Sequence, residues 1–303
     1  RRIQRQQTLA AALDWSYDLL APREQQVFRR LAAFAGDFSL AAAEGVCAGD
    51  GIGPAELLDV LGSLVAKSLV LGTHPSNQGT PAGGGAVEMR YRLLETVRLY
   101  ATDKLAAAGE AAPVRTRHRD WYLGWLQATP LERLVFDAQT LAAIARETDN
   151  LRAAAELSLA QNRHDLLARQ ATRMLGHWFM NSTFREAQQW LARVEQAPAA
   201  LAIEDQAACA TLWGFLGVMS LDLRDAKQAA EQGIALARGL PGHDAAVWRT
   251  LAHIVRGFML GSAGSALQAD AAIAPQARRH GELALAAARD AALPEVWPAF
   301  VQC

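Results

Sequence analysis

The chain has 303 residues and a mass of 32.6 kDa, which is enough for about two domains of ordinary size. Apolar residues make up 51% of the chain, so it can bury a core, and this content excludes an intrinsically disordered protein. The 30 Lys and Arg residues nearly cancel the 31 Asp and Glu residues, and the net charge of −1 argues against a general attraction to nucleic acid or to anionic membranes.

Residues 1 to about 110 combine short helices with a β signal. Cap residues and prolines predict helices over the ranges 8–20, 22–36, 39–47 and 54–67. Residues 68–71 read as a strand, and the alternating pattern of residues 87–93 makes them its expected partner. The segment between them, 73–85, is rich in Gly, Pro, Ser and Asn and is expected to be a loop. Helices followed by a strand, a long loop and a return strand follow the order of a winged-helix domain, in which this loop would be the wing.

The rest of the chain, residues 111–303, is predicted to be helical throughout. The pattern predicts helices at 94–108 and 112–127, two more within 131–160, and then a series of helix pairs. The clearest pair covers residues 209–242, where Trp213, Gly217, Ala229 and Pro241 match the tetratricopeptide (TPR) pattern. The small Gly217 and Ala229 would let two helices approach closely. The expected fold is therefore mostly α, with a winged-helix-like domain followed by a TPR-like superhelix.

Large aromatic residues fall on the first helices of these pairs. In TPR arrays those helices line the concave surface, so the candidate partner-binding residues are Trp178, Trp213 and Trp248. The alternative is that they pack between neighbouring repeats, which is what large apolar side chains usually do in such arrays, and the sequence favours this alternative.

Four sequence blocks carry a resemblance to a known family. They are QTLAAALDWSYDLL with EQQVFRRLAAFAG (residues 7–20 and 24–36), LGSLVAKSLV (61–70), YRLLETVRLYA (91–101) and ETDNLRAA (147–154). Together they resemble the winged-helix segment of bacterial STAND-class regulatory ATPases, many of which are transcriptional regulators. The resemblance implies a preceding nucleotide-binding domain of the NB-ARC type, which would bind ATP or ADP, and TPR-like helices behind. The chain departs from the family at Gln6, where a His is common, and this departure would alter a contact with the nucleotide-binding domain if the His makes one.

The chain itself shows no pattern for a catalytic, cofactor or metal site. A phosphate-binding loop needs the pattern GxxxxGK[ST], and the nearest string, residues 62–68, lacks the second Gly and lies at a helix end. Its Lys67 is expected to face the helix dipole. The residues HRD at 118–120 imitate part of a kinase motif and are expected to be surface charge. The seven His are scattered along the sequence, and the three Cys (Cys47, Cys209 and Cys303) form no metal-binding pair.

We therefore expect a non-enzymatic regulatory and sensory region of a STAND-class ATPase. The winged helix would contact the chain's own nucleotide-binding domain, and the repeats would bind a protein or small effector. The alternatives are a DNA-binding winged-helix protein with a TPR tail and a stand-alone TPR adaptor. Direct DNA contact is disfavoured because the helix at 54–67 is acidic and the wing lacks Lys and Arg.

The absence of a signal peptide and of an 18-residue apolar run predicts a cytoplasmic location without a membrane span. The start at Arg1 rather than Met predicts a piece of a longer protein.

Overall fold

The chain divides into two compact units, each with its own core. The computed structural model describes residues 11–73, 89–197, 199, 201–220, 223–266, 273–290 and 292–293. These residues are mostly α-helical, which confirms the prediction of a mostly α fold. Unit 1 comprises Arg1–Gly124 and Arg146–Leu157, and unit 2 comprises Trp125–Ala145 and Ser158–Cys303. Unit 1 thus extends beyond the boundary expected near residue 110 and includes a short segment from the helical half of the chain.

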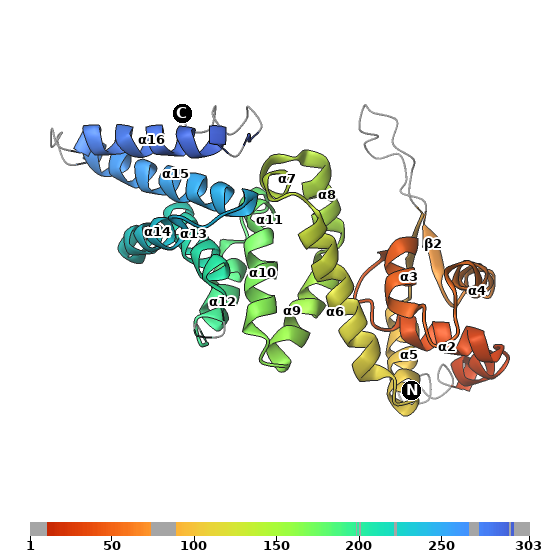
Figure 1. Ribbon diagram of the computed structural model, residues 1–303. Helices are drawn as coiled ribbons and strands as arrows, with labels where there is room; N and C mark the ends of the chain where they lie inside the picture. Colours follow the sequence, from red (N-terminus) through yellow and green to blue (C-terminus); the bar gives the residue numbers. More distant parts are fainter. Residues whose placement is uncertain are drawn as a thin grey trace. The chain divides into compact units, whose positions relative to one another are not determined.

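Local sequence signals place the first helices of unit 1. After helical residues 11–18 come three helices: α2 (Pro22–Leu31), α3 (Leu40–Cys47) and α4 (Pro54–Ala66) (Figure 1). Pro22 and Pro54 open α2 and α4 in the first turn, as expected. The Ser39 hydroxyl accepts a hydrogen bond from the Ala42 amide at 3.1 Å and caps α3. The three helices bury a shared apolar face that includes Val27, Phe28, Leu31, Val46, Leu57, Leu61 and Leu64.

A small antiparallel sheet accompanies these helices. Its strands are β1 (Phe38–Ser39), β2 (Leu71–Thr73) and β3 (Arg90–Arg92), in the order β1-β3-β2. Gly72 lies opposite Tyr91, so the two later strands pair as predicted, but β2 shares only Leu71 with the expected strand at 68–71, and β3 is shorter than the expected 87–93. The strand β1 is not expected from the sequence. Most of the expected wing, together with residues 1–10, lies outside the described residues.

The helices that follow the sheet differ from the prediction in number. They are α5 (Glu95–Ala107), α6 (Ala111–Ala128), α7 (Leu131–Phe136), α8 (Ala138–Arg146) and α9 (Thr148–Ala160). Three helices rather than two therefore occupy the range 131–160. One break lies at Asp137, whose carboxylate accepts a hydrogen bond from the Thr140 amide at 2.9 Å and starts α8. The other lies at Glu147, whose side chain is bound within unit 1.

A buried polar cluster, which we call the Glu147 cluster, completes unit 1. The Glu147 carboxylate pairs with Arg90 at 2.5 Å and accepts hydrogen bonds from Tyr122 Oη at 2.8 Å and Asn150 Nδ2 at 3.1 Å. Arg90 also pairs with Asp37 at 2.9 Å. The side chains of Arg90 and Glu147 are both only 7% exposed, so the pair lies in the core. Burial, together with the Glu147 carboxylate, raises the pKa of Tyr122 and keeps it a hydrogen-bond donor.

Two residues of the HRD string are buried, which corrects the expectation that it is surface charge. His118 is 3% exposed and packs edge-on against Phe34, and Arg119 is 5% exposed. The His118 ring lies 3.4 Å from Asn150 Oδ1. Burial lowers the pKa of His118 to about 4, so the imidazole is neutral near pH 7. Only Asp120 of the string is exposed.

Unit 2 is built from helices packed in sequence. Its further helices are α10 (His164–Arg173), α11 (Leu175–Met180), α12 (Phe184–Val194), α13 (Ile203–Met219), α14 (Leu223–Ala237), α15 (His243–Ala266) and α16 (Ile273–Asp290). The predicted pair at 209–242 corresponds to α13 and α14. These two helices cross tightly at Gly214, where a Cβ would lie 3.1 Å from the Ala230 amide, and at Gly233, where it would lie 2.5 Å from Thr211 Oγ1. The small residues Gly214 and Gly233 thus allow these two helices to approach closely.

Candidate functional site

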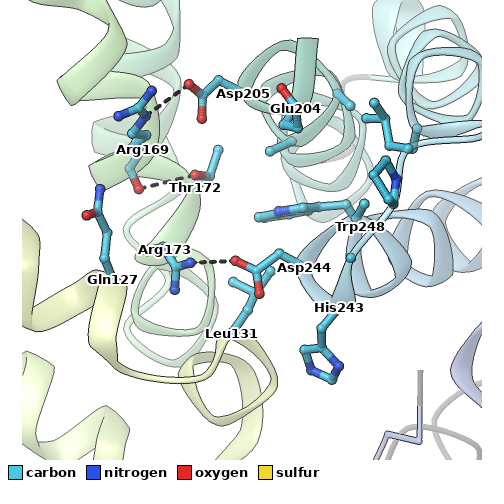
Figure 2. Close-up of a pocket in the computed structure, with 17 residues that line it drawn as sticks. Gln127, Leu131, Arg169, Thr172, Arg173, Glu204, Asp205, His243, Asp244 and Trp248 are labelled. Carbon is cyan, nitrogen blue, oxygen red and sulfur yellow. Dashed lines mark hydrogen bonds and ion pairs between the residues drawn. The ribbon is translucent and has the colours of Figure 1, made fainter. Parts of the chain in front are cut away.

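A cavity of about 540 Å³ lies within unit 2, and its size is typical of small-ligand sites. Its walls come from the C-terminal end of α6, from α7, α10 and α13, from the end of α14, and from the start of α15 (Figure 2). We call it the α10–α13–α15 cavity. Several of the side chains that line it are charged and partly exposed to solvent, among them Arg169, Asp244 and Glu204.

One wall of the cavity is a face of α10. Arg169 and Arg173 lie four residues apart, and Thr172 lies between them, so all three project from the same side of the helix. Thr172 turns its hydroxyl back to the Ala168 carbonyl at 2.9 Å. The two guanidinium groups therefore carry the charge of this wall.

Carboxylates face these two arginines from the opposite wall. Arg169 Nε donates to Asp205 Oδ2 at 3.0 Å, and Arg173 Nη2 donates to Asp244 Oδ2 (Figure 2). Asp205 lies in the first turn of α13 and Asp244 in the first turn of α15, where the helix dipole stabilises a negative charge. Glu204 stands beside Asp205 and also lines the cavity.

The Arg173 guanidinium is held by several groups at once. Besides Asp244, it donates from Nη1 to the Leu126 carbonyl at 3.2 Å and to the Thr129 carbonyl at 3.0 Å. The side chain is only 16% exposed. Arg173 is thus fixed in place by the end of α6 as well as by α15.

Burial makes Asp205 an unusual carboxylate. Desolvation raises its pKa above the ordinary value of 3.8, although its bond to Arg169 acts in the opposite direction. The neighbouring charges of Glu204 and Asp165 raise this pKa further. The Asp205 side of the cavity therefore carries more negative charge than Arg169 compensates.

The cavity also has an apolar side. Trp248 follows Asp244 by one helical turn, and its indole extends toward the side chains of α10 (Figure 2). Ala207, Ala208 and Leu240 line the same space. A flat aromatic ring beside carboxylates and guanidinium groups is suited to holding a ligand that has both charged and apolar parts.

The three tryptophans predicted to bind partners lie in different surroundings. Trp178 in α11 has no exposed surface and donates its indole N–H to the Ala171 carbonyl at 3.1 Å. Trp213 in α13 lines a smaller cavity of about 110 Å³ together with Cys209. Trp248 lines the α10–α13–α15 cavity. Trp178 and Trp248 are thus both buried, at 0% and 6% exposed, while Trp213 and Trp248 border separate cavities.

Neither cavity presents an activated thiol. Cys209 beside the smaller cavity has its pKa raised to about 12 by burial, and the thiol stays protonated near pH 7. Cys47 in unit 1 is fully buried, and burial raises its pKa to about 12 as well.

A pair of histidines comes together across two helices of unit 2. The Nδ1 atoms of His253 in α15 and His280 in α16 lie 3.0 Å apart. Burial lowers the pKa of His253 to about 4, and burial also lowers that of His280, so both rings are neutral near pH 7 and one can donate to the other. Because 27 residues separate them, no spacing rule indicates this contact.

Potential metal ligands are dispersed in the part of the chain that the structure describes. It contains no group of three or more His, Cys, Asp or Glu side chains arranged to hold a metal ion. Among the helices of the same residues, none is both long and apolar enough to cross a lipid bilayer.

Comparison with known proteins relates the chain to regulators. It is 39% identical over 264 residues, covering 82% of the chain, to proteins of Mycobacterium bovis and Mycobacterium tuberculosis that are described provisionally as HTH-type transcriptional regulators. The chain spans only 28% of the length of these relatives. It is also 40% identical over 115 residues to uncharacterised proteins of both species, which covers 38% of the chain and 27% of each relative.

Two other comparisons found nothing similar. No family model matches the chain. No solved structure matches it either. The support for a regulatory role, in general terms, comes from the similarity to the mycobacterial proteins.

Proposed function

We propose that this chain is the regulatory and sensory region of a STAND-class signalling ATPase that controls transcription. In this proposal a nucleotide-binding domain of the NB-ARC type precedes the chain and holds ATP or ADP, and the chain itself catalyses nothing. Unit 1 contacts that domain and restrains it, and unit 2 binds an effector that releases the restraint. The effector must bind the released state more tightly than the restrained one.

The similarity to the mycobacterial regulators carries this proposal. It extends over 82% of the chain yet only 28% of each relative, so those proteins have ample length for a nucleotide-binding domain and a DNA-binding domain elsewhere. The four blocks that resemble STAND proteins supply the class. In unit 1, three helices and an antiparallel sheet in the order β1-β3-β2 are compatible with a winged helix. In unit 2, the crossing of α13 and α14 at small residues is compatible with a TPR-like pair.

An exposed apolar edge on unit 1 is the surface that we assign to the nucleotide-binding domain. Trp15 is 68% exposed and Leu19 is 64% exposed, and they lie four residues apart. The same segment is attached to unit 1 through Tyr17, which packs against Phe28 and Tyr100. An indole and a leucine that face solvent from an anchored segment are suited to covering by another domain.

Direct DNA binding by unit 1 is the second candidate function, because the relatives are described as HTH-type. The charges of α4 argue against it. Lys67 at its C-terminal end pairs with Glu24 at 2.5 Å, and Glu56 near its start pairs with Arg23 at 3.5 Å. A helix that reads DNA needs free cations near the phosphates, and Asp59 adds a further negative charge to this one.

Two experiments test the proposed function. The first is to read the gene upstream of Arg1, where we expect a strand, a GxxxxGK[ST] loop and a helix in frame. The second is to replace Trp15 by Ser in the complete protein and to measure ATP turnover and reporter transcription without effector. We expect basal activity to rise several-fold with Trp15→Ser and to stay unchanged with Trp15→Phe, which keeps the apolar ring. An upstream region without a phosphate-binding loop, or unchanged basal activity in Trp15→Ser, would contradict the proposal.

A further inference from the structure

We propose that the α10–α13–α15 cavity binds an organic cation, namely an alkylammonium group on an aliphatic chain. This inference rests on the proposed function, since it names the chemistry of the effector for unit 2. Three features of the cavity support it: the balance of its charges, the unequal engagement of those charges, and its apolar wall.

The charges that line the cavity favour a positive ligand. Among the described residues that line it, the carboxylates of Glu204, Asp205 and Asp244 outnumber the guanidinium groups of Arg169 and Arg173. A cation would bring this set to neutrality, whereas an anion would add to the excess negative charge.

The two arginines are already placed beside carboxylates. Arg173 uses Nη1 for two backbone carbonyls and Nη2 for Asp244, and Arg169 donates Nε to Asp205 at 3.0 Å. A carboxylate or phosphate ligand would have to displace Asp244 from Arg173, or bind the remaining nitrogens of Arg169 beside the Asp205 carboxylate, which would repel it. An incoming cation meets neither cost.

The carboxylates, by contrast, have capacity left. Among the described residues, Glu204 has no hydrogen-bond or ion-pair partner, and it borders Asp205 at the start of α13. Asp205 is held by one guanidinium nitrogen, and its raised pKa reflects a carboxylate that is poorly solvated and only partly neutralised. An ammonium group between Glu204 and Asp205 would supply the missing positive charge and up to three N–H donors.

The apolar wall fits the rest of such a ligand. Trp248 extends its indole into the cavity (Figure 2), and Ala207 and Ala208 also line it. An aliphatic chain would pack against these groups, and an ammonium group near the indole face gains a cation–π attraction. The volume of about 540 Å³ accommodates a chain of several carbons.

Calorimetric titration of the 303-residue chain with three probes of equal length tests the inference. The probes are cadaverine, glutarate and 1,5-pentanediol, which carry ammonium, carboxylate and hydroxyl groups at the ends of five-carbon chains. We expect binding of cadaverine that weakens as salt is raised, and no binding of the other two. A short peptide with one central Lys, compared with the same peptide carrying acetyl-lysine, tests whether the alkylammonium group comes from a protein side chain rather than from a free amine.

A matched pair of variants locates the binding. Glu204→Gln removes a charge from the cavity, and we expect cadaverine affinity to fall at least about fivefold. Glu282→Gln removes the same charge from an exposed position of α16 and is expected to leave affinity unchanged. Both glutamates are exposed, so both variants are expected to fold.

The other outcomes overturn the inference. Preferred binding of glutarate, equal loss in both variants, or no binding of any ammonium probe would each reject an organic cation as the ligand. The proposed function is read separately, from the upstream sequence and from the basal activity of Trp15→Ser. A failure of the cation proposal is therefore distinguishable from a failure of the regulatory one.

Discussion

Replacing Glu147 by Leu is expected to destabilise unit 1 more than any exposed substitution on the helix that follows it. The change removes the ion pair with Arg90 and the acceptor for Tyr122 and Asn150. Arg90 would then keep only one of its two ionic partners, Asp37, although the Arg90 side chain is only 7% exposed.

The size of the effect follows from these contacts. Breaking a buried ion pair by removing one partner costs about 3–5 kcal/mol, and each buried donor left without an acceptor costs about 1–3 kcal/mol. The contacts belong to one network, so the terms do not add, and we expect a total of about 3–5 kcal/mol. That is a large share of the roughly 5–15 kcal/mol that holds an ordinary domain folded. Glu147→Gln keeps an acceptor oxygen and is expected to cost less.

Hydrogen exchange measures this loss within unit 1. Amide protection in β3 and α9 is expected to fall in Glu147→Leu, while protection in α13 and α14 is expected to be unchanged. Urea unfolding followed by circular dichroism gives an independent midpoint.

The control is Asp149→Asn in α9, since the Asp149 side chain is 67% exposed and its pair with Arg152 spans 3.5 Å. We expect less than about 0.5 kcal/mol from the control. A loss below about 1 kcal/mol in Glu147→Leu would refute the argument that this buried pair stabilises unit 1.

Three further predictions concern groups buried at close contacts. The pKa of His118 is about 4 in the folded chain and near 6.5 when unfolded, so the stability from neutral His118 is present above pH 6.5 and lost as pH falls toward 4. Urea midpoints at pH 7 and pH 5 should show about 2 kcal/mol more acid destabilisation in the wild type than in His118→Gln, and an equal change in both would contradict this. Gly45→Ala would place a Cβ 1.9 Å from Trp121 Cδ1 and should cost roughly 1–3 kcal/mol, whereas Gly62→Ala, with no atom within 4 Å, should stabilise α4 by about 0.5–1 kcal/mol. Equal urea midpoints for the two variants would show that the Trp121 contact is unimportant. Gly176→Ala would bring a Cβ to 2.2 Å from the Leu134 carbonyl, and faster amide exchange in α7 and α11 is the expected result, while wild-type exchange would count against it.

The parts of the fold that the sequence predicts well are determined by residues close together in the chain. The start of α3 at Ser39 and the start of α4 at Pro54 follow from caps that act within one turn. The position of β3 follows from the alternating pattern of residues 87–93, whereas β2 begins at Leu71 rather than at Ser68. The two-residue strand β1 has too little pattern to be recognised. The helix break at Glu147 has a long-range cause, because the Glu147 side chain is bound to Arg90, which lies 57 positions earlier in the chain (147 − 90).

The candidate site is less predictable than the fold, because its charges look like ordinary surface residues in the sequence. Arg169 and Arg173 have the i, i+4 spacing of one helix face, but so do many solvated pairs. Their partners Asp205 and Asp244 lie 36 and 71 residues away, and nothing local indicates those contacts. Trp248 is a candidate partner-binding residue from its place in a helix pair, and it lies at the wall of this cavity. The sequence therefore names one residue that lines the cavity, but it does not reveal which charged residues come together there.

The return of residues 146–157 to unit 1 affects how this protein can be dissected or recombined. A fragment that stops near residue 110, or even at Gly124, would contain Arg90 without Glu147 and Asn150, so its core would hold a guanidinium with half its partners missing. No single cut separates the two units into intact pieces, since the chain passes between them three times. Chimeras with the mycobacterial relatives should therefore exchange residues 146–157 together with the N-terminal portion. A junction placed in the apparent linker before α6 would divide one folding unit between two parents.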